Sequence, residues 1–226
     1  MGAATIELTA SDGHQLAAYE SRPKQATAAV VIAQEIFGLN PHIRSVVDRY
    51  AALGFHAIAP ALFDRVERGI ELGYTSDDVA RGRDIRTAIE WDVTMLDVAA
   101  AVTHVAATGP VAAIGYCWGG SLAWLSASQL PVAAAVGYYG GQITQFLDRA
   151  PRCPVQLHFG ALDAAIPLDG VAKIGEQYPD VEIHVYEEAD HGFNCDARAT
   201  YHPAAAALAL ERTLAFLAGA GVSGAG

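Results

Sequence analysis

The sequence predicts an α/β fold with a mostly parallel central sheet, helices on both of its faces and an antiparallel hairpin at the N-terminus. Three observations support this. The segments Thr5–Leu8 and Leu16–Glu20 alternate in polarity around Asp12-Gly13, a strong turn dipeptide, which indicates the hairpin. Ala28–Ala33 is an uninterrupted apolar run, as expected of a strand buried on both faces. After it, short apolar segments alternate with longer helical ones, which is the pattern of a parallel sheet.

The remaining elements follow in a regular order along the chain. We expect a helix over His42–Leu53 ending at Gly54, a strand over Phe55–Ala59 stopped by Pro60, one long helical region over Ser76–Ala107 capped by Ser76-Asp77-Asp78, a strand over Val111–Gly115, a helix over Gly119–Ser128, strands over Val132–Tyr138, Val155–Phe159 and Val181–Tyr186, and a closing helix over Tyr201–Leu217. In such sheets functional groups gather at the carboxyl ends of the strands.

Bulk composition limits the classes of function. The chain has 226 residues, which fits one domain, expected over residues 1–218 with a flexible tail at 219–226. Hydrophobic residues at 52% and charged residues at 17% argue against disorder. The net charge of −11 argues against nucleic acid or an anionic membrane as a partner. Three cysteines make a poor disulfide framework, and no apolar run is long enough to span a membrane. We therefore expect a soluble, cytoplasmic protein.

A candidate nucleophile lies in Gly115-Tyr116-Cys117-Trp118-Gly119, between a predicted strand and a predicted helix. This is the strand–turn–helix setting of a nucleophile elbow, with cysteine in the place of serine. The helix N-terminus favours a thiolate and helps to hold an oxyanion. A lone cysteine is more often buried and inert, but a side chain at such a turn points out from the sheet edge. Cys153 and Cys195 lack this setting and are expected to be inert.

An acid and a base follow in the chain order that the elbow predicts. Asp163 follows the strand Val155–Phe159, and His191 follows the strand Val181–Tyr186, so both should reach the same sheet edge as Cys117. Other candidates are weaker. His158 and His184 lie within strands, and Asp190 is adjacent to His191 and should point away from it.

With these residues the sequence resembles the dienelactone hydrolase family (carboxymethylenebutenolidases) of the α/β-hydrolase superfamily over nearly its whole length. The most specific matching segments are residues 31–38 (VIAQEIFG), 115–120 (GYCWGG), 136–140 (VGYYG) and 186–191 (YEEADH). The resemblance implies an α/β-hydrolase fold and a Cys117–Asp163–His191 triad. It also implies that Glu35 keeps the resting thiol neutral until substrate binds; an ion pair with an arginine is the alternative for this carboxylate.

The resemblance further implies how substrate is held. The backbone N–H groups of Ile36 and Trp118 match the family's oxyanion hole, and Tyr139 matches a tyrosine that lines the pocket. A helix arginine that grips the substrate carboxylate corresponds to Arg81, although Arg83 is also possible.

A second family arginine falls at Cys195, with Arg198 nearby as a possible substitute. Because of this departure, the resemblance specifies the substrate less closely than it specifies ester hydrolysis as the reaction.

The sequence therefore predicts hydrolysis of a small lactone or ester, with dienelactone conversion to maleylacetate as the leading hypothesis. Neither metal nor other cofactor is expected, because no clustered metal-ligand spacing and no phosphate-binding loop is present. The small-molecule substrate is expected to carry a carboxylate. A broad carboxylesterase acting on neutral esters is one alternative, and a non-catalytic ligand-binding or thiol-sensing protein is another.

Overall fold

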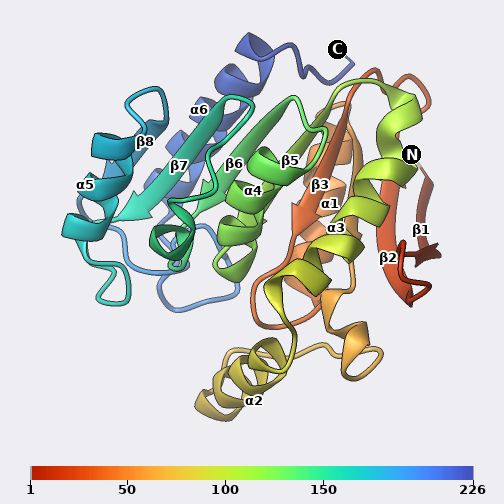
Figure 1. The fold of residues 1–226 in the computed structure, drawn as a ribbon, viewed down its shortest axis with the longest axis horizontal. Helices are drawn as coiled ribbons and strands as arrows, with labels where there is room; N and C mark the ends of the chain where they lie inside the picture. Colours follow the sequence, from red (N-terminus) through yellow and green to blue (C-terminus); the bar gives the residue numbers. More distant parts are fainter. Residues whose placement is uncertain (1, 226) are drawn as a thin grey trace. The chain divides into compact units, whose positions relative to one another are not determined.

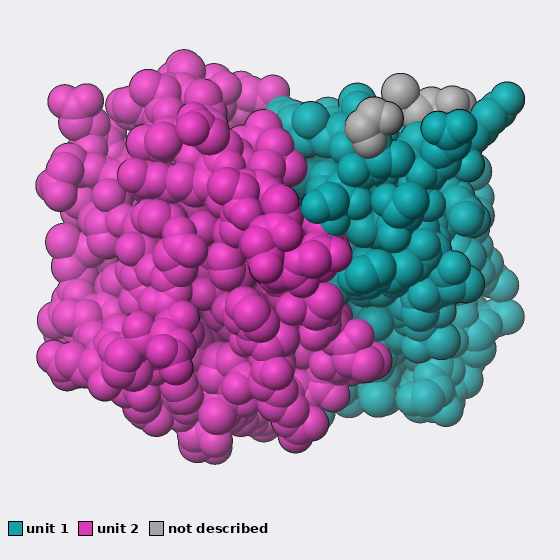
Figure 2. Space-filling model, turned by 90° about the horizontal axis from the view of Figure 1, so that it is seen from above, with its two compact units in different colours: residues 1–111, 223–226 teal, residues 112–222 magenta. Residues whose placement is uncertain are grey.

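The computed structural model describes residues 2–225 and divides the chain into two compact units. Unit 1 comprises residues 1–111 and 223–226, and unit 2 comprises residues 112–222; Figure 2 shows them in teal and magenta. The expectation of one domain over residues 1–218 stays a prediction.

Unit 1 contains four strands in the order β1-β2-β4-β3: β1 (Gly2–Thr9), β2 (Gln15–Arg22), β4 (His56–Pro60) and β3 (Ala29–Ala33). Strands β1 and β2 pair antiparallel, which confirms the predicted hairpin, and Gly13 in their turn has a φ of 87°. Strand β2 pairs antiparallel with β4, whereas β3 and β4 are parallel. Every residue of β3 and β4 is buried, as the apolar run predicts.

Helices α1 (Pro41–Ala52) and α3 (Trp91–Val105) cover opposite faces of these strands (Figure 1). Side chains along β2 show this directly. The Tyr19 hydroxyl donates a hydrogen bond to Asp48 on α1, while the carboxylate of the next residue, Glu20, bonds to His104 on α3. Neighbouring residues of a strand point to opposite faces, so the two helices enclose the sheet between them.

The long helical region predicted over Ser76–Ala107 is wrong as one element. It forms two helices, α2 (Ser76–Thr87) and α3, because Glu90 adopts an extended conformation between them. No proline or glycine marks the break, so the sequence pattern carried no stop signal. The predicted cap is also displaced by one residue: the Thr75 side chain accepts from the Asp78 N–H, and the Asp78 carboxylate accepts from the Thr75 N–H, forming a capping box.

Unit 2 contains four parallel strands in the order β5-β6-β7-β8: β5 (Val111–Tyr116), β6 (Ala134–Tyr138), β7 (Val155–Gly160) and β8 (Glu182–Tyr186). Helix α4 (Trp118–Gln129) packs on one face and α6 (Pro203–Gly219) on the other. Gly137 approaches the Gly120 backbone of α4, while the next residue, Tyr138, bonds through its hydroxyl to Thr213 of α6. The parallel strands and two-sided helices match the predicted fold class.

Several smaller features lie outside the sequence prediction. Helix α5 (Leu168–Gln177) follows β7, and short 3₁₀ turns occur at Leu62–Arg65, Ala106–Thr108 and Ile143–Phe146. The chain beyond α6 makes defined contacts: the Ala225 N–H donates to the Gly54 carbonyl, and the Thr27 hydroxyl donates to the Ser223 carbonyl. Within residues 2–225, no helix combines the length and hydropathy needed to cross a membrane.

Candidate active site

The turn between β5 and α4 holds Cys117 in a conformation that few side chains adopt. Its φ of 55° and ψ of −116° lie outside the ordinary regions for L-residues, which stores backbone strain. Two hydrogen bonds hold the strained residue. The Cys117 N–H donates to the Tyr138 carbonyl at 3.0 Å, and the Gly120 N–H donates to the Cys117 carbonyl at 2.9 Å. The half-buried thiol therefore has a fixed origin at the carboxyl end of β5.

The glycines around Cys117 are required by close backbone contacts. A Cβ atom at Gly115 would overlap the carbonyl of Gly119, because the strand and the following helix nearly touch there. A Cβ atom at Gly120 would lie 2.6 Å from the Tyr138 carbonyl oxygen. Only residues without a side chain fit these positions, which gives the elbow sequence its steric cause.

Cys117, His191 and Asp163 form a continuous hydrogen-bonded chain within unit 2. The Sγ atom of Cys117 lies 3.2 Å from Nε2 of His191, and Nδ1 of the same ring lies 2.7 Å from Oδ2 of Asp163. The other Asp163 oxygen accepts from the Ala165 N–H at 2.9 Å. The Asp163 carboxylate is almost fully buried. This is the nucleophile–base–orienter geometry on which covalent acyl transfer depends.

The loop after β8 holds the backbone of His191 from both sides. Its N–H donates to Oδ1 of Asp190 at 2.6 Å, and its carbonyl accepts from the Thr200 hydroxyl at 2.7 Å. Asp190 thus points away from the imidazole, as expected, and binds the His191 peptide instead. The part played by Thr200 was not predicted, because nothing in the sequence links it to a histidine nine residues earlier.

The electrostatic surroundings favour a proton on the His191 ring. Burial opposes the charge, but the negative Cys117 sulfur and the Asp163 carboxylate, both hydrogen-bonded to the ring, outweigh it and raise the pKa of His191 from 6.5 to about 10. The charges on either side of the ring therefore favour its protonated form. A base held this way is also positioned to return its proton to a leaving group.

Two aromatic residues of unit 2 lie beside this chain. Tyr139, directly after β6, has a φ of 40°, donates its N–H to the His158 carbonyl at 2.7 Å and places its ring centroid 5.1 Å from that of His191. Trp118 is the first residue of α4, so its N–H is among those that a helix leaves without an intrahelical partner. Its indole is buried.

The Arg198 side chain lies against Gly192, the residue that follows His191 in the chain. Gly192 has a φ of 78°, and a Cβ atom there would collide with the Arg198 guanidinium. The absence of a side chain at Gly192 therefore allows the guanidinium to approach the loop that carries His191. The sequence indicated Arg198 only as a possible substitute for an arginine that is missing at Cys195. The Cys195 side chain is fully buried.

The other predicted site residues belong to unit 1. Glu35 and Ile36 follow the carboxyl end of β3, and Glu35 is buried. Arg81 on α2 is exposed and forms an ion pair with both carboxylate oxygens of Glu67, each at 3.0 Å. Arg83 lies on the same helix and is exposed. The roles of these four residues stay predictions.

A buried hydrogen-bond network beneath the triad explains the histidine within β7. His158 bonds through Nδ1 to the Tyr186 hydroxyl at 2.9 Å, and through Nε2 to Oε1 of Gln156 and to the Thr213 hydroxyl. Burial lowers its pKa well below 6.5, so the ring is neutral. Thr213 also bonds to the hydroxyl of Tyr138 at 2.7 Å. His158 is a hydrogen-bonded core residue, as expected, and ties α6 to the sheet.

Comparison with known proteins identifies the family. A model described as the dienelactone hydrolase family matches residues 16–220. The carboxymethylenebutenolidases of Pseudomonas putida and Pseudomonas knackmussii are each 36% identical over 225 residues, covering 94% of this chain and 95% of theirs.

Solved structures agree. A Klebsiella pneumoniae protein provisionally assigned as a dienelactone hydrolase has a TM-score of 0.82 and 31% identity, covering 96% of this chain and 99% of its own. A dienelactone hydrolase-like promiscuous phosphotriesterase from metagenomic libraries shares the fold, with a TM-score of 0.73 and 20% identity, covering 99% of this chain and all of its own. The chain is therefore an ester hydrolase of the α/β-hydrolase fold and belongs to the dienelactone hydrolase family.

Proposed function

We propose that this protein hydrolyses dienelactone (carboxymethylenebutenolide) to maleylacetate through a covalent acyl-cysteine intermediate. One observation carries the chemistry: the 3.2 Å contact between Cys117 Sγ and His191 Nε2, at the end of a hydrogen-bonded chain from Asp163. The choice of dienelactone rests on the family resemblance and on the carboxymethylenebutenolidases that this chain resembles.

In the first half-reaction the Cys117 thiol gives its proton to Nε2 of His191, and the resulting thiolate attacks the lactone carbonyl carbon to form a tetrahedral oxyanion. When this collapses, the ring C–O bond breaks and leaves a thioester to Cys117. The leaving enolate oxygen takes the proton that His191 holds, so charge and proton both balance. The resulting enol tautomerises to the ketone. The raised pKa of His191 suits this order, because the ring holds its proton while the sulfur is anionic.

In the second half-reaction the neutral His191 ring takes a proton from water as the water oxygen attacks the thioester carbonyl. The C–S bond then breaks, the acid is released, and the proton returns from His191 to the sulfur. Asp163 stays ionised throughout and keeps the same ring nitrogen facing the sulfur. One base thus serves both steps without a further cofactor in the scheme.

The backbone N–H groups of Trp118 and Ile36 are assigned to the oxyanion. The assignment of Trp118 is supported by its place at the first position of α4, where the helix N-terminus favours negative charge. The assignment of Ile36 to the oxyanion rests on the family resemblance. So does the assignment of Glu35 as the group that keeps the resting thiol neutral. Glu35 is buried, and a buried carboxyl group needs hydrogen-bond partners to offset the loss of water.

For the substrate carboxylate we assign Arg198 in addition to Arg81. The contact of Arg198 with Gly192 brings a guanidinium next to the loop that carries His191. Arg81 forms an ion pair with Glu67 and would have to leave that pair. An exposed ion pair contributes on the order of 1 kcal/mol or less, so a substrate carboxylate can compete for Arg81. Tyr139, packed on His191, is assigned to the pocket wall.

The test is a comparison of dienelactone with p-nitrophenyl acetate, using the wild type and Cys117→Ala. The proposal expects the wild type to prefer dienelactone strongly in kcat/KM and the variant to lose turnover of both substrates. A preference for the neutral ester would instead favour a broad carboxylesterase. Undiminished turnover in Cys117→Ala would exclude the cysteine mechanism. Reversible oxidation of Cys117 with no turnover of either substrate would favour a thiol-sensing protein.

A further inference from the structure

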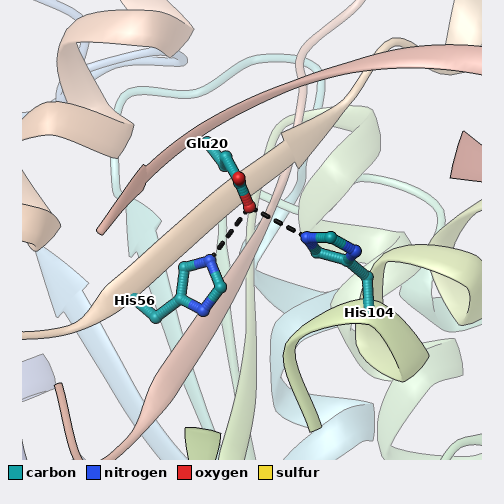
Figure 3. A group of neighbouring side chains, drawn as sticks. All are labelled: Glu20, His56 and His104. Atoms are coloured by element: carbon teal, nitrogen blue, oxygen red, sulfur yellow. Dashed lines mark hydrogen bonds and ion pairs between the residues drawn. The ribbon is translucent and has the colours of Figure 1, made fainter. Parts of the chain in front are cut away.

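Unit 1 contains a second group of titratable side chains, formed by Glu20, His56 and His104 (Figure 3). The Nε2 atom of His56 lies 3.0 Å from Oε2 of Glu20, and Nε2 of His104 lies 2.9 Å from the same oxygen. The rings meet edge to face, with centroids 6.1 Å apart. Two imidazole nitrogens and one carboxylate oxygen thus converge on one point, with these atoms all within 4.8 Å of one another.

Three different elements bring this cluster together. Glu20 on β2 pairs with Ile58 on β4, so His56, two residues from Ile58, lies on the same face in the diagonal position. Helix α3 packs on that face and ends just after His104. Glu20 lies 36 positions from His56 and 84 positions from His104 in the chain, so the sequence shows no short spacing between metal ligands.

We propose that Glu20, His56 and His104 form a binding site for a divalent transition-metal ion, with Zn²⁺ as the reference ion. Two imidazoles and one carboxylate are a recurring ligand set for zinc, completed by water in the fourth position. Tetrahedral bonds of about 2.0–2.1 Å place neighbouring ligand atoms about 3.3 Å apart. The observed 2.9 and 3.0 Å need to open by only a few tenths of an ångström.

The surroundings of His56 supply an outer partner for such a site. Nδ1 of His56 lies 2.9 Å from the hydroxyl of Thr108. Without metal, His56 donates from Nε2 to Glu20 and accepts from Thr108 at Nδ1. With metal, Nε2 binds the ion and Nδ1 donates to Thr108 instead. A hydroxyl serves both roles, and such partners orient metal-bound histidines.

The local charges favour a cation on balance. The Glu20 carboxylate supplies a negative charge at the point where both histidines bond to it. The carboxyl end of α3 adds negative potential beside His104. Arg22 is an opposing positive charge, because it acts electrostatically on His56 and would repel a bound cation.

An ion can reach the cluster from solvent. The His56 side chain is 3% exposed, but that of His104 is 37% exposed. His104 also lines a groove of about 420 Å³ between β1 and α3, together with Glu7 and Thr103. Binding would join β2, β4 and α3 at one point, and should therefore stabilise unit 1.

The experiment uses the full chain with Cys117→Ala, because the active-site thiol is itself a strong zinc ligand. ZnCl₂ is titrated by calorimetry and by thermal unfolding, in this background and with each of Glu20→Gln, His104→Ala and Thr108→Val added. His184→Ala is the matched control. His184 also pairs with a glutamate, Glu182, but among the described residues no second histidine bonds to that carboxylate. None of these readouts depends on turnover, so the result stands apart from the proposed reaction.

We expect one Zn²⁺ per chain and a rise in unfolding temperature with zinc in the Cys117→Ala background. His104→Ala and Glu20→Gln should abolish both, Thr108→Val should weaken affinity by about 10-fold or more, and His184→Ala should change neither. Glu20→Gln retains a hydrogen-bond acceptor, so loss there distinguishes metal binding from a structural hydrogen-bond cluster. No binding in the background protein, or equal binding in all variants, overturns the proposal.

Discussion

Oδ2 of Asp163 lies 2.7 Å from Nδ1 of His191, and this contact decides which ring nitrogen faces the Cys117 sulfur. The second oxygen of Asp163 is occupied by the Ala165 N–H, so the carboxylate cannot rotate without losing a bond. The orientation of the base is therefore set by two strand-end loops together, one after β7 and one after β8.

Asp163→Asn should show how much the orientation of the His191 ring contributes to the rate, because the variant keeps the ring itself. An amide can still bond to the ring, but it favours the wrong tautomer and removes a negative charge. We expect kcat to fall by about 10³- to 10⁴-fold with a small change in KM, and the pKa of His191 to fall from about 10. Steady-state kinetics and an NMR titration of the His191 ring measure the two effects. An unchanged His191 titration would contradict the assignment.

The raised pKa of His191 also predicts how stability depends on pH. The folded-state value of about 10 lies above the ordinary value of 6.5, so the protonated ring stabilises the fold fully below about pH 6.5. This contribution, up to a few kcal/mol, is lost as pH rises from about 6.5 through about 10. Urea unfolding across this window should show a decline in the wild type that His191→Gln flattens. Parallel curves for the two proteins would remove His191 as the cause.

Cys117→Ser tests whether the base is tuned for a thiol. The strained backbone at this position does not depend on the side-chain atom beyond Cβ, so the fold should be kept. A serine hydroxyl is far harder to ionise than a thiol, and we expect kcat/KM to fall by about 10³-fold or more. Circular dichroism controls for folding. Activity within tenfold of the wild type would show that thiolate formation is not needed.

Arg198→Ala should act on charged substrates selectively. If the guanidinium holds a substrate carboxylate, KM for dienelactone should rise about tenfold or more while KM for p-nitrophenyl acetate changes little. Arg81→Ala is measured alongside, with Arg83→Ala on the same helix as its control. Equal effects of Arg198→Ala on both substrates would assign it to supporting the loop at Gly192 rather than to binding.

Gly115→Ala tests the steric argument for the elbow. A Cβ atom there would overlap the Gly119 carbonyl, and neither backbone segment can move away cheaply. We expect a loss of about 3 kcal/mol or more in the free energy of unfolding, or no soluble protein. Gly141→Ala is the matched control, because the nearest atom to its Cβ is the side chain of Ile166 at 3.5 Å, an ordinary contact. Similar stabilities for both variants would refute the argument.

The sequence predicted the fold class because its signals are local. The Asp12-Gly13 turn and the apolar run of β3 specify their own structures, and each is present. The break before α3 was missed because Ala88, Ile89 and Glu90 carry no stop signal, such as proline or glycine, between the two helices. Helix α5 was missed because Gly170 and Gly175 interrupt its ten residues, and glycine in a helix interior weakens the signal of the apolar spacing.

For the site, the sequence could place groups at strand ends but not the contacts between them. Cys117, Asp163 and His191 were named from their positions after strands, and the structure brings them within hydrogen-bond distance. The support from Thr200 to the His191 carbonyl depends on how the one loop between β8 and α6 folds back on itself. No residue type or spacing signals such a contact, so it could be found only in three dimensions.

The contact of Arg198 with Gly192 bears on how this enzyme could change over evolutionary time. If one arginine both selects the substrate and braces the loop that carries the base, a mutation that broadens the substrate range also loosens the machinery that turns substrate over. Lineages that adapt to new esters would then need a compensating change near Gly192. Specificity and rate would be inherited as linked traits, and laboratory evolution should recover substitutions at these two positions in pairs.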